Sequence, residues 1–189
     1  MLHKSDSKEI IKVGLILFAI TAIAALVLAL MNSVTAPIIQ ANEEEKQQLA
    51  MQKVLPEATS FDAENLRTDS MDAIVTAVYK AENAGYAVMV SPNGYGGAIS
   101  MAVGVDRTGT VTGVDIISQS ETAGLGSNCT KDEFKNQFIG KTAGVGVSKS
   151  GAKENEIDAI SSATITSKAV ATGVNAAIDA AEQLEKGGN

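Results

Sequence analysis

Five hydroxyl side chains lie within the seven residues from Ser161 to Ser167, directly before a long segment with helical apolar periodicity. The first backbone N–H groups of a helix lack intrahelical partners, and Ser or Thr side chains commonly cap them. One or two hydroxyls are enough for a cap, whereas several hydroxyls, free N–H groups and the helix dipole together also suit a phosphate. The segment therefore predicts either a capped helix start or an anion site.

The composition excludes several other kinds of site. Of 189 residues one is Cys, Cys129, and one is His, His3, which excludes an internal disulfide and a thiolate metal centre within this chain and argues against a His-based triad. With 15 Lys and Arg against 22 Asp and Glu, the net charge of −7 argues against nucleic acid as a partner. The usual GxGxxG and GxxxxGK[ST] nucleotide motifs are also missing from the sequence. Hydroxyls, carboxylates, backbone groups or a bound cofactor must then carry the chemistry.

Two glycine-punctuated loops precede the hydroxyl-rich segment. One runs from Pro92 to Gly97, and the other is the long polar stretch from Ser118 to Ser127. Long ordered loops are more often functional than idle. Within them, Glu121 is either a proton partner or a solvated carboxylate, and Tyr95 either contacts a ligand or packs.

Three segments, taken together, resemble a known family. Asp158–Ser167, DAISSATITS, resembles the flavinylation motif D-x-x-[ST]-G-A-[ST]-x-T of FMN-binding domains; Glu121–Gly126, ETAGLG, is similar to that family's E-T-P-G-L-G; and Gly94–Gly97, GYGG, precedes a predicted strand as it does there. With a single apolar segment at the N-terminus, this order is similar to that of the G subunits of Rnf ferredoxin:NAD oxidoreductase complexes. The C subunits of sodium-pumping NADH:quinone oxidoreductases are related, but longer.

The resemblance implies an electron-transfer subunit whose FMN is joined to the side-chain oxygen of Thr166 by a phosphoester. It further implies cofactor-binding positions, which lie in the helix start, the long loop and the GYGG turn: Ser161, Ser162, Ala163, Thr164 and Ser167; Glu121, Thr122, Gly124, Leu125 and Gly126; and Tyr95 and Gly96. The implied partners are integral membrane and iron–sulfur subunits, a second flavinylated subunit, and a flavin transferase for maturation. The isolated chain is expected to be a carrier in a complex that couples ferredoxin oxidation and NAD reduction to Na⁺ or H⁺ transport.

Two residues depart from the family pattern, Ser162 in place of the usual Gly and Ala123 in place of the frequent Pro. A glycine at position 162 would permit close backbone approach or an unusual φ, which Ser would strain. Two alternatives to the carrier remain open: a membrane-anchored module that binds another anion or a partner without redox chemistry, and a flavin-bearing reductase that acts alone.

The elements that must position these residues begin with a membrane anchor. Residues 13–31 are uncharged and would span roughly 28 Å as a helix, close to the ~30 Å hydrocarbon core. Three Lys precede this segment and three consecutive Glu follow it, so the positive-inside rule predicts a cytoplasmic N-terminus, residues 1–12, and an acidic extracytoplasmic domain on the cell's inner membrane. Pro37 is expected to kink or end the helix, and a connector helix is expected within residues 32–56, stopped by Pro56.

Residues 57–189 are predicted to form an α+β domain. Two hairpins are expected from the runs 74–80 with 86–91 and 99–105 with 111–117, which predicts an antiparallel sheet. Thr130 and Glu133 fit a capping box for a short helix through Phe138, on which Phe134 and Phe138 share a face. A polar connector, 144–156, then leads to the hydroxyl-rich segment and a C-terminal helix with an apolar face that ends at the final glycines.

Overall fold

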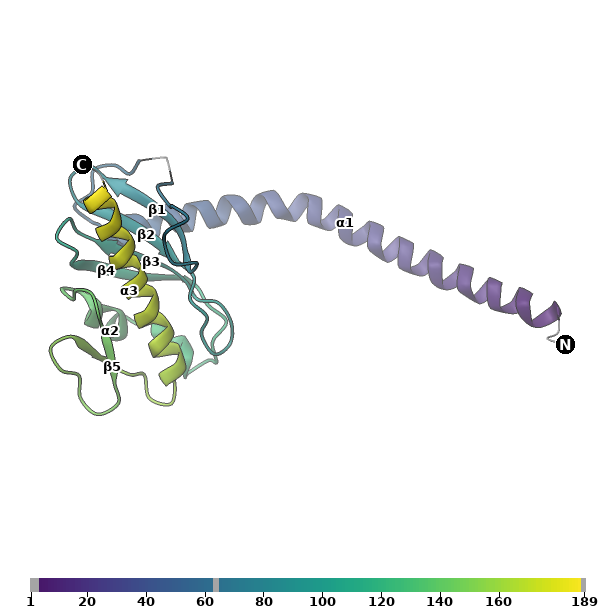
Figure 1. The fold of residues 1–189 in the computed structure, drawn as a ribbon. Coiled ribbons are helices and arrows are strands. Elements are labelled where there is room, and N and C mark those ends of the chain that lie inside the picture. The colour runs from purple at the N-terminus through teal and green to yellow at the C-terminus, as the bar shows by residue number, and fades with distance from the viewer. Residues whose placement is uncertain (1–3, 63–64, 188–189) are drawn as a thin grey trace. The chain divides into compact units, whose positions relative to one another are not determined.

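The computed structural model describes residues 4–62 and 65–187, which form an α+β chain of two units, Met1–Glu45 and Lys46–Asn189 (Figure 1). The elements in chain order are α1 Lys4–Val54, β1 Val75–Ala81, β2 Gly85–Val90, β3 Ser100–Val105, β4 Val111–Ser118, the 3-10 turn η1 Gly126–Thr130, α2 Asp132–Lys135, the 3-10 turn η2 Asn136–Phe138, β5 Gly146–Ser148, β6 Glu156–Asp158 and α3 Thr164–Gly187. The first unit is entirely helical where it is described.

Strands β1 to β4 form an antiparallel sheet in sequence order, which confirms both expected hairpins. The first hairpin closes at the Ala81–Gly85 pair, where Gly85 has φ +119° and lies against β3, so that a Cβ there would meet the Val105 carbonyl oxygen. In the second hairpin, the Asp106 carboxylate accepts hydrogen bonds from the N–H groups of Thr108 and Thr110. Burial opposes ionisation of Asp106, but a hydrogen bond from the Thr108 hydroxyl, together with these two backbone hydrogen bonds, outweighs it and lowers the pKa of Asp106.

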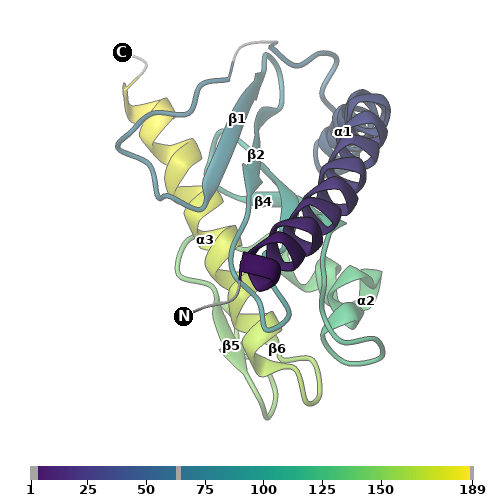
Figure 2. The same cartoon turned by 90° about the vertical axis from the view of Figure 1, so that its right-hand side faces the viewer.

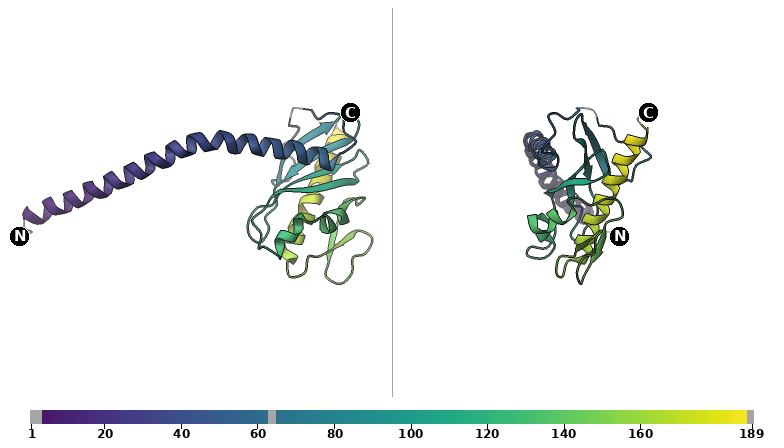
Figure 3. Two further views of the ribbon diagram at one scale, coloured as in Figure 1. Left: turned by 180° about the vertical axis from the view of Figure 1, so that it is seen from behind. Right: turned by 90° about the vertical axis from the view of Figure 1, so that its left-hand side faces the viewer.

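Both faces of the sheet are covered, because the alternating side chains of each strand enter two different apolar clusters. Along β2, Tyr86, Val88 and Val90 face the cluster that α3 completes, whereas Ala87 and Met89 face the cluster containing the end of α1. Figure 2 shows α3 crossing one face of the sheet, and Figure 3 shows the same layers from two further sides. One buried face of the sheet thus supports α3 along its apolar side.

The last turns of α1, which belong to the second unit, rest on a row of small residues. Ala87, Gly104 and Gly113 are paired side by side across β2, β3 and β4. The Val54 carbonyl oxygen lies above this row and accepts a 2.6 Å hydrogen bond from the Thr112 hydroxyl. The end of α1 is therefore fixed by backbone approach as well as by apolar packing.

An ion-pair cluster joins the same helix end to the sheet and to α2. Asp115 of β4, whose side chain is 13% exposed, contacts Lys53 Nζ at 3.2 Å and Lys135 Nζ at 3.0 Å. Burial disfavours the charged form of Lys135, but hydrogen bonds to Asp115 and Asp132 outweigh this and raise its pKa.

Three local expectations need correction. Of the two outcomes expected at Pro37, a kink or an end, the end is wrong: α1 continues past Pro37 to Val54, because the loss of one backbone hydrogen bond does not end a long helix with intact turns on both sides. The capping box expected at Thr130 does not form. Residues 126–130 form a 3-10 turn, in which the Thr130 hydroxyl donates to the Ser127 carbonyl. Helix α2 therefore starts after Lys131, which is its N-cap residue. The connector 144–156 contains β5 and leads into β6, and these two strands pair in parallel.

The C-terminal part agrees with its prediction. Phe134 and Phe138 are both buried and meet edge to face, with ring centroids 5.5 Å apart. Helix α3 buries Val170, Val174 and Ile178 along its apolar face and ends at Gly187. The hydroxyl-rich segment therefore lies at the start of a helix that is held firmly against the sheet.

Candidate functional site

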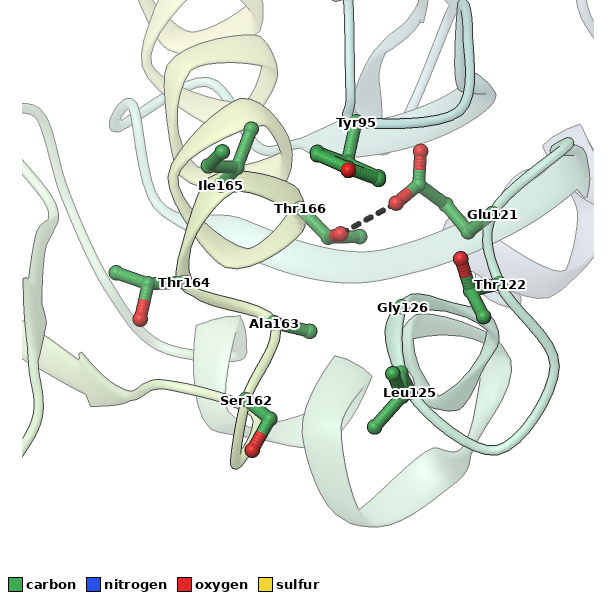
Figure 4. A pocket seen from close by; sticks show the side chains of 10 residues that line it. All are labelled: Tyr95, Glu121, Thr122, Leu125, Gly126, Ser162, Ala163, Thr164, Ile165 and Thr166. Carbon is green, nitrogen blue, oxygen red and sulfur yellow. Dashed lines mark hydrogen bonds between the residues drawn. The ribbon is translucent and has the colours of Figure 1, made fainter.

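A pocket of about 570 Å³ lies at the N-terminal end of α3, within the range typical of small-molecule sites. Three segments line it: the GYGG turn, the loop after β4, and the start of α3 (Figure 4). The lining residues are Tyr95, Glu121, Thr122, Leu125, Gly126, Ser162, Ala163, Thr164, Ile165 and Thr166. The fold thus brings together three segments that are distant in the sequence, since Tyr95 and Thr166 are 71 positions apart.

Thr166 lies in the first turn of α3 with 1% of its surface exposed. Its hydroxyl Oγ1 donates a 2.5 Å hydrogen bond to Glu121 Oε2 across the pocket, drawn as a dashed line in Figure 4. The neighbouring Ser167 differs, because its hydroxyl donates to the Ala163 carbonyl and accepts from the Ile160 N–H. The two adjacent hydroxyls therefore differ in role: Ser167 ties the turn before α3 to the first turn of the helix, whereas Thr166 lines the pocket.

Glu121 is a buried carboxylate, 8% exposed, and not a solvated loop residue. Its Oε1 accepts a 2.8 Å hydrogen bond from the Gly96 N–H. A Cβ on Gly94 would lie 2.4 Å from Oε1, and a Cβ on Gly126 would lie 2.4 Å from Oε2. These glycines of the two loops leave the space that the carboxylate fills.

Ser162 has φ +61° and is the one non-glycine residue with positive φ in the part of the chain that the structure describes. It occupies a turn closed by the Ala163 N–H and the Ile160 carbonyl, just before α3. A left-handed backbone favours glycine. The expectation that this position needs glycine-like freedom is confirmed.

The remaining predicted residues are placed as follows. Thr122 and Thr164 line the pocket, whereas Ser161, Gly96, Gly124 and Ser167 do not. Gly96 contributes its N–H to Glu121, and Gly124, at φ +76°, forms the loop bend in which its N–H donates to the Ser127 hydroxyl. Ile165 also lines the pocket but was not predicted, because it occupies a variable position of the motif. The sequence feature that could have identified it is a large apolar side chain outside the apolar face of α3.

Apolar side chains line the pocket together with the hydroxyls and the carboxylate. Tyr95, Leu125 and Ile165 are 73%, 42% and 56% exposed. No Lys or Arg is among the lining residues, so a phosphate there would depend on hydroxyls and on the free N–H groups at the start of α3. A phosphorylated aromatic ligand such as FMN fits this combination of an apolar rim, a helix N-terminus and adjacent hydroxyls.

The described residues near the pocket do not favour metal binding or thiol chemistry. Among the described residues, no three His, Cys, Asp or Glu side chains are grouped so as to hold a metal ion. Cys129 is fully buried, and burial together with the nearby charge of Glu121 raises the pKa of its thiol to about 11. Since the thiolate is the reactive form, Cys129 is a packing residue at neutral pH.

Comparisons with known proteins agree with the geometry. Residues 94–179 match the model of the FMN-binding domain, and residues 1–54 match that of the RnfG N-terminal region. The chain is 37% identical to the G subunit of the Na⁺-translocating ferredoxin:NAD⁺ oxidoreductase complex of Acetobacterium woodii, with 96% of each chain covered. It is 34% identical to the G subunit of the proton-translocating ferredoxin:NAD⁺ oxidoreductase complex of Clostridium ljungdahlii, with 83% of each covered. The crystal structure of Shewanella oneidensis NqrC shares the fold, at 19% identity over 72% of each chain and a TM-score of 0.51.

Proposed function

Because the chain belongs to the family of Rnf complex G subunits, we propose that it carries electrons within an ion-translocating ferredoxin:NAD oxidoreductase complex on FMN linked covalently to Thr166. The observation that carries the proposal is the Thr166 hydroxyl, which lines a pocket shared by all three motif segments. The match to the FMN-binding domain supports FMN as the cofactor, and the similarity to G subunits supports membership of the complex.

The residues of the pocket would hold the cofactor in two ways. Free N–H groups at the start of α3 and the Thr164 hydroxyl would bind the phosphate, and the apolar rim of Tyr95, Leu125 and Ile165 would contact the ring system. When bound, FMN supplies one- and two-electron redox chemistry, which this chain's own side chains lack. A covalent bond would keep the cofactor in place without a high concentration of free flavin outside the cell.

The apolar N-terminal helix is the basis for the proposed membrane location of the protein. A segment of α1 has a mean hydropathy of 2.9 and is unburied, so the helix is long and apolar enough to cross a membrane. We place residues 13–31 in the inner membrane, 1–12 in the cytoplasm, and the connector 32–56 and the domain 57–189 outside. Its partners would be integral membrane and iron–sulfur subunits, a second flavinylated subunit and a flavin transferase.

The test is the intact mass of the full chain, produced with a flavin transferase, for the native sequence, Thr166→Ala and Thr164→Ala. We expect an FMN-sized increment on the native chain and on Thr164→Ala, and none on Thr166→Ala, because only Oγ1 of Thr166 is the linking atom. All three should unfold cooperatively, with Thr166→Ala at a somewhat lower temperature, because it leaves the buried Glu121 Oε2 without its donor.

An adduct that persists on denatured Thr166→Ala would overturn the linkage. A native chain that stays colourless with an active transferase would instead favour the anion- or partner-binding module.

A further inference from the structure

We propose that Glu121 accepts the proton that Thr166 loses when its hydroxyl is esterified, so that this chain supplies the base for its own modification. The inference rests on the proposed linkage to Thr166 and adds a role for a second residue. It is carried by the direct contact between the two side chains and by the way the fold enforces that contact.

The hydroxyl of Thr166 departs from the usual behaviour of helical threonines. Ser and Thr in helices commonly donate to a backbone carbonyl three or four residues earlier. In α1, Thr21 donates to Leu17 and Phe18, and Thr35 donates to Met31. Thr166 donates to Glu121 Oε2 instead, at 2.5 Å, although it too lies in a helix. Its proton is thereby already directed at a carboxylate.

The carboxylate has little freedom to be elsewhere. Oε1 is held by the Gly96 N–H, and the Cα atoms of Gly94 and Gly126 adjoin the two oxygens so closely that a methyl group on either would overlap them. A Cβ on Gly126 would also lie 2.7 Å from Thr166 Oγ1. The glycines of both loops therefore leave the space in which the carboxylate and the hydroxyl meet.

No competing base lines the pocket. Apart from Glu121, its one titratable lining residue is Tyr95, a phenol that is 73% exposed, and no His, Lys or Asp is among the lining residues. A hydroxyl is a weak nucleophile unless an adjacent base takes its proton. Glu121 is the side chain in position to do so.

The step balances as a phosphoryl-group transfer from an activated flavin nucleotide, a pyrophosphate such as flavin adenine dinucleotide. The Thr166 O–H bond breaks and an Oγ1–phosphorus bond forms, while the pyrophosphate bond breaks and adenosine monophosphate leaves. The proton passes to Glu121 Oε2, and no electron is transferred. Protonation also removes the repulsion that a carboxylate anion would feel beside the new phosphodiester.

The experiment measures the initial rate of modification of the full chain in detergent, with a purified flavin transferase, flavin adenine dinucleotide and Mg²⁺. Intact mass and flavin fluorescence of the denatured chain give the rate. Glu121→Gln keeps the shape but removes the base, and we expect its rate to fall on the order of 10²-fold. Glu154→Gln, the same change of charge at an exposed site, should modify at the native rate.

A Glu121→Gln rate within about threefold of the native rate, with native-like thermal unfolding, would overturn the proposal. If Glu121→Gln unfolds, the decision passes to Glu121→Ala with added formate, a small carboxylate that can enter the vacated space. A rate that rises with formate but not with chloride supports the base, and a rate that formate leaves unchanged rejects it. Failure of the native chain to be modified would reject the proposed linkage itself, which distinguishes the two failures.

Discussion

At residue 162 the backbone adopts a conformation that its own side chain opposes. Ser162 is exposed and has φ +61°, a left-handed conformation that disfavours a residue with a Cβ. The turn at Ser162 is nevertheless required, because it lies directly before α3, which begins at Thr164. It thereby sets the position of Thr166. The strain is thus located next to the proposed attachment site.

Ser162→Gly should stabilise the protein. A left-handed conformation costs an L-residue about 1–2 kcal/mol, whereas glycine costs about 0.5–1 kcal/mol in unfolded-state entropy, so a net gain of up to about 1.5 kcal/mol is expected. Ser161→Gly makes the same chemical change at an exposed neighbour without positive φ and should destabilise slightly. Thermal unfolding of both variants gives the signs; a loss of stability in Ser162→Gly would show that the turn does not store this strain.

At the scale of elements, the junction between α1 and the sheet depends on the absence of side chains. Gly104 and Gly113 are directly paired on β3 and β4, and both face Val54. A Cβ on Gly104 would lie 2.2 Å from the Val54 carbonyl oxygen and 2.4 Å from the Thr112 hydroxyl that binds it. The helix can therefore approach the sheet to backbone contact only over these glycines.

Gly104→Ala should lower the free energy of unfolding by about 1–3 kcal/mol, as overpacking of a buried site commonly does. Its Cβ must displace backbone and break the hydrogen bond between Thr112 and Val54. Gly187→Ala, at the end of α3 with no atom within 4 Å of the added Cβ, is the matched control and should be near neutral. Denaturant unfolding measures both, and equal stabilities would contradict a close junction.

At the scale of the whole molecule, the net charge differs in sign on the two sides of the membrane anchor. The net charge is −7, and the flank before the apolar segment carries three Lys against two acidic residues, so about −8 lies beyond the segment. Such a domain is repelled by anionic headgroups and is not expected to lie flat on the membrane. The Lys residues before the apolar segment are the basis for proposing that the domain is extracytoplasmic.

Trypsin added to right-side-out membrane vesicles should cleave the domain, whose Lys149 and Lys153 are exposed in the loop between β5 and β6. Inverted vesicles should protect these sites until detergent is added, because the proposed orientation puts the domain inside them. Mass spectrometry of the fragments identifies the cut sites. The reverse pattern of protection would reject the proposed orientation.

The sequence by itself determined the features that depend on local chemistry. The strands, their two hairpins and the buried face of α3 follow from alternation, turn residues and helical periodicity, and the structure confirms them within about a residue. The departure from the family's usual Gly at Ser162 also predicted an unusual φ there, and Ser162 has φ +61°. The three motif segments and the long apolar helix likewise predicted the family, which the comparisons confirm.

Only the tertiary structure decided which of the adjacent hydroxyls faces the pocket and what it contacts. Thr166 and Glu121 are 45 residues apart, and their contact exists because the sheet brings the loop after β4 to the start of α3. Burial of Glu121, the space left by Gly94 and Gly126, and the parallel pairing of β5 with β6 are equally non-local. Local patterns specify the conformation of a segment, whereas the environment of a side chain is set by segments distant in the sequence, and that environment gives Thr166 and Glu121 their chemistry.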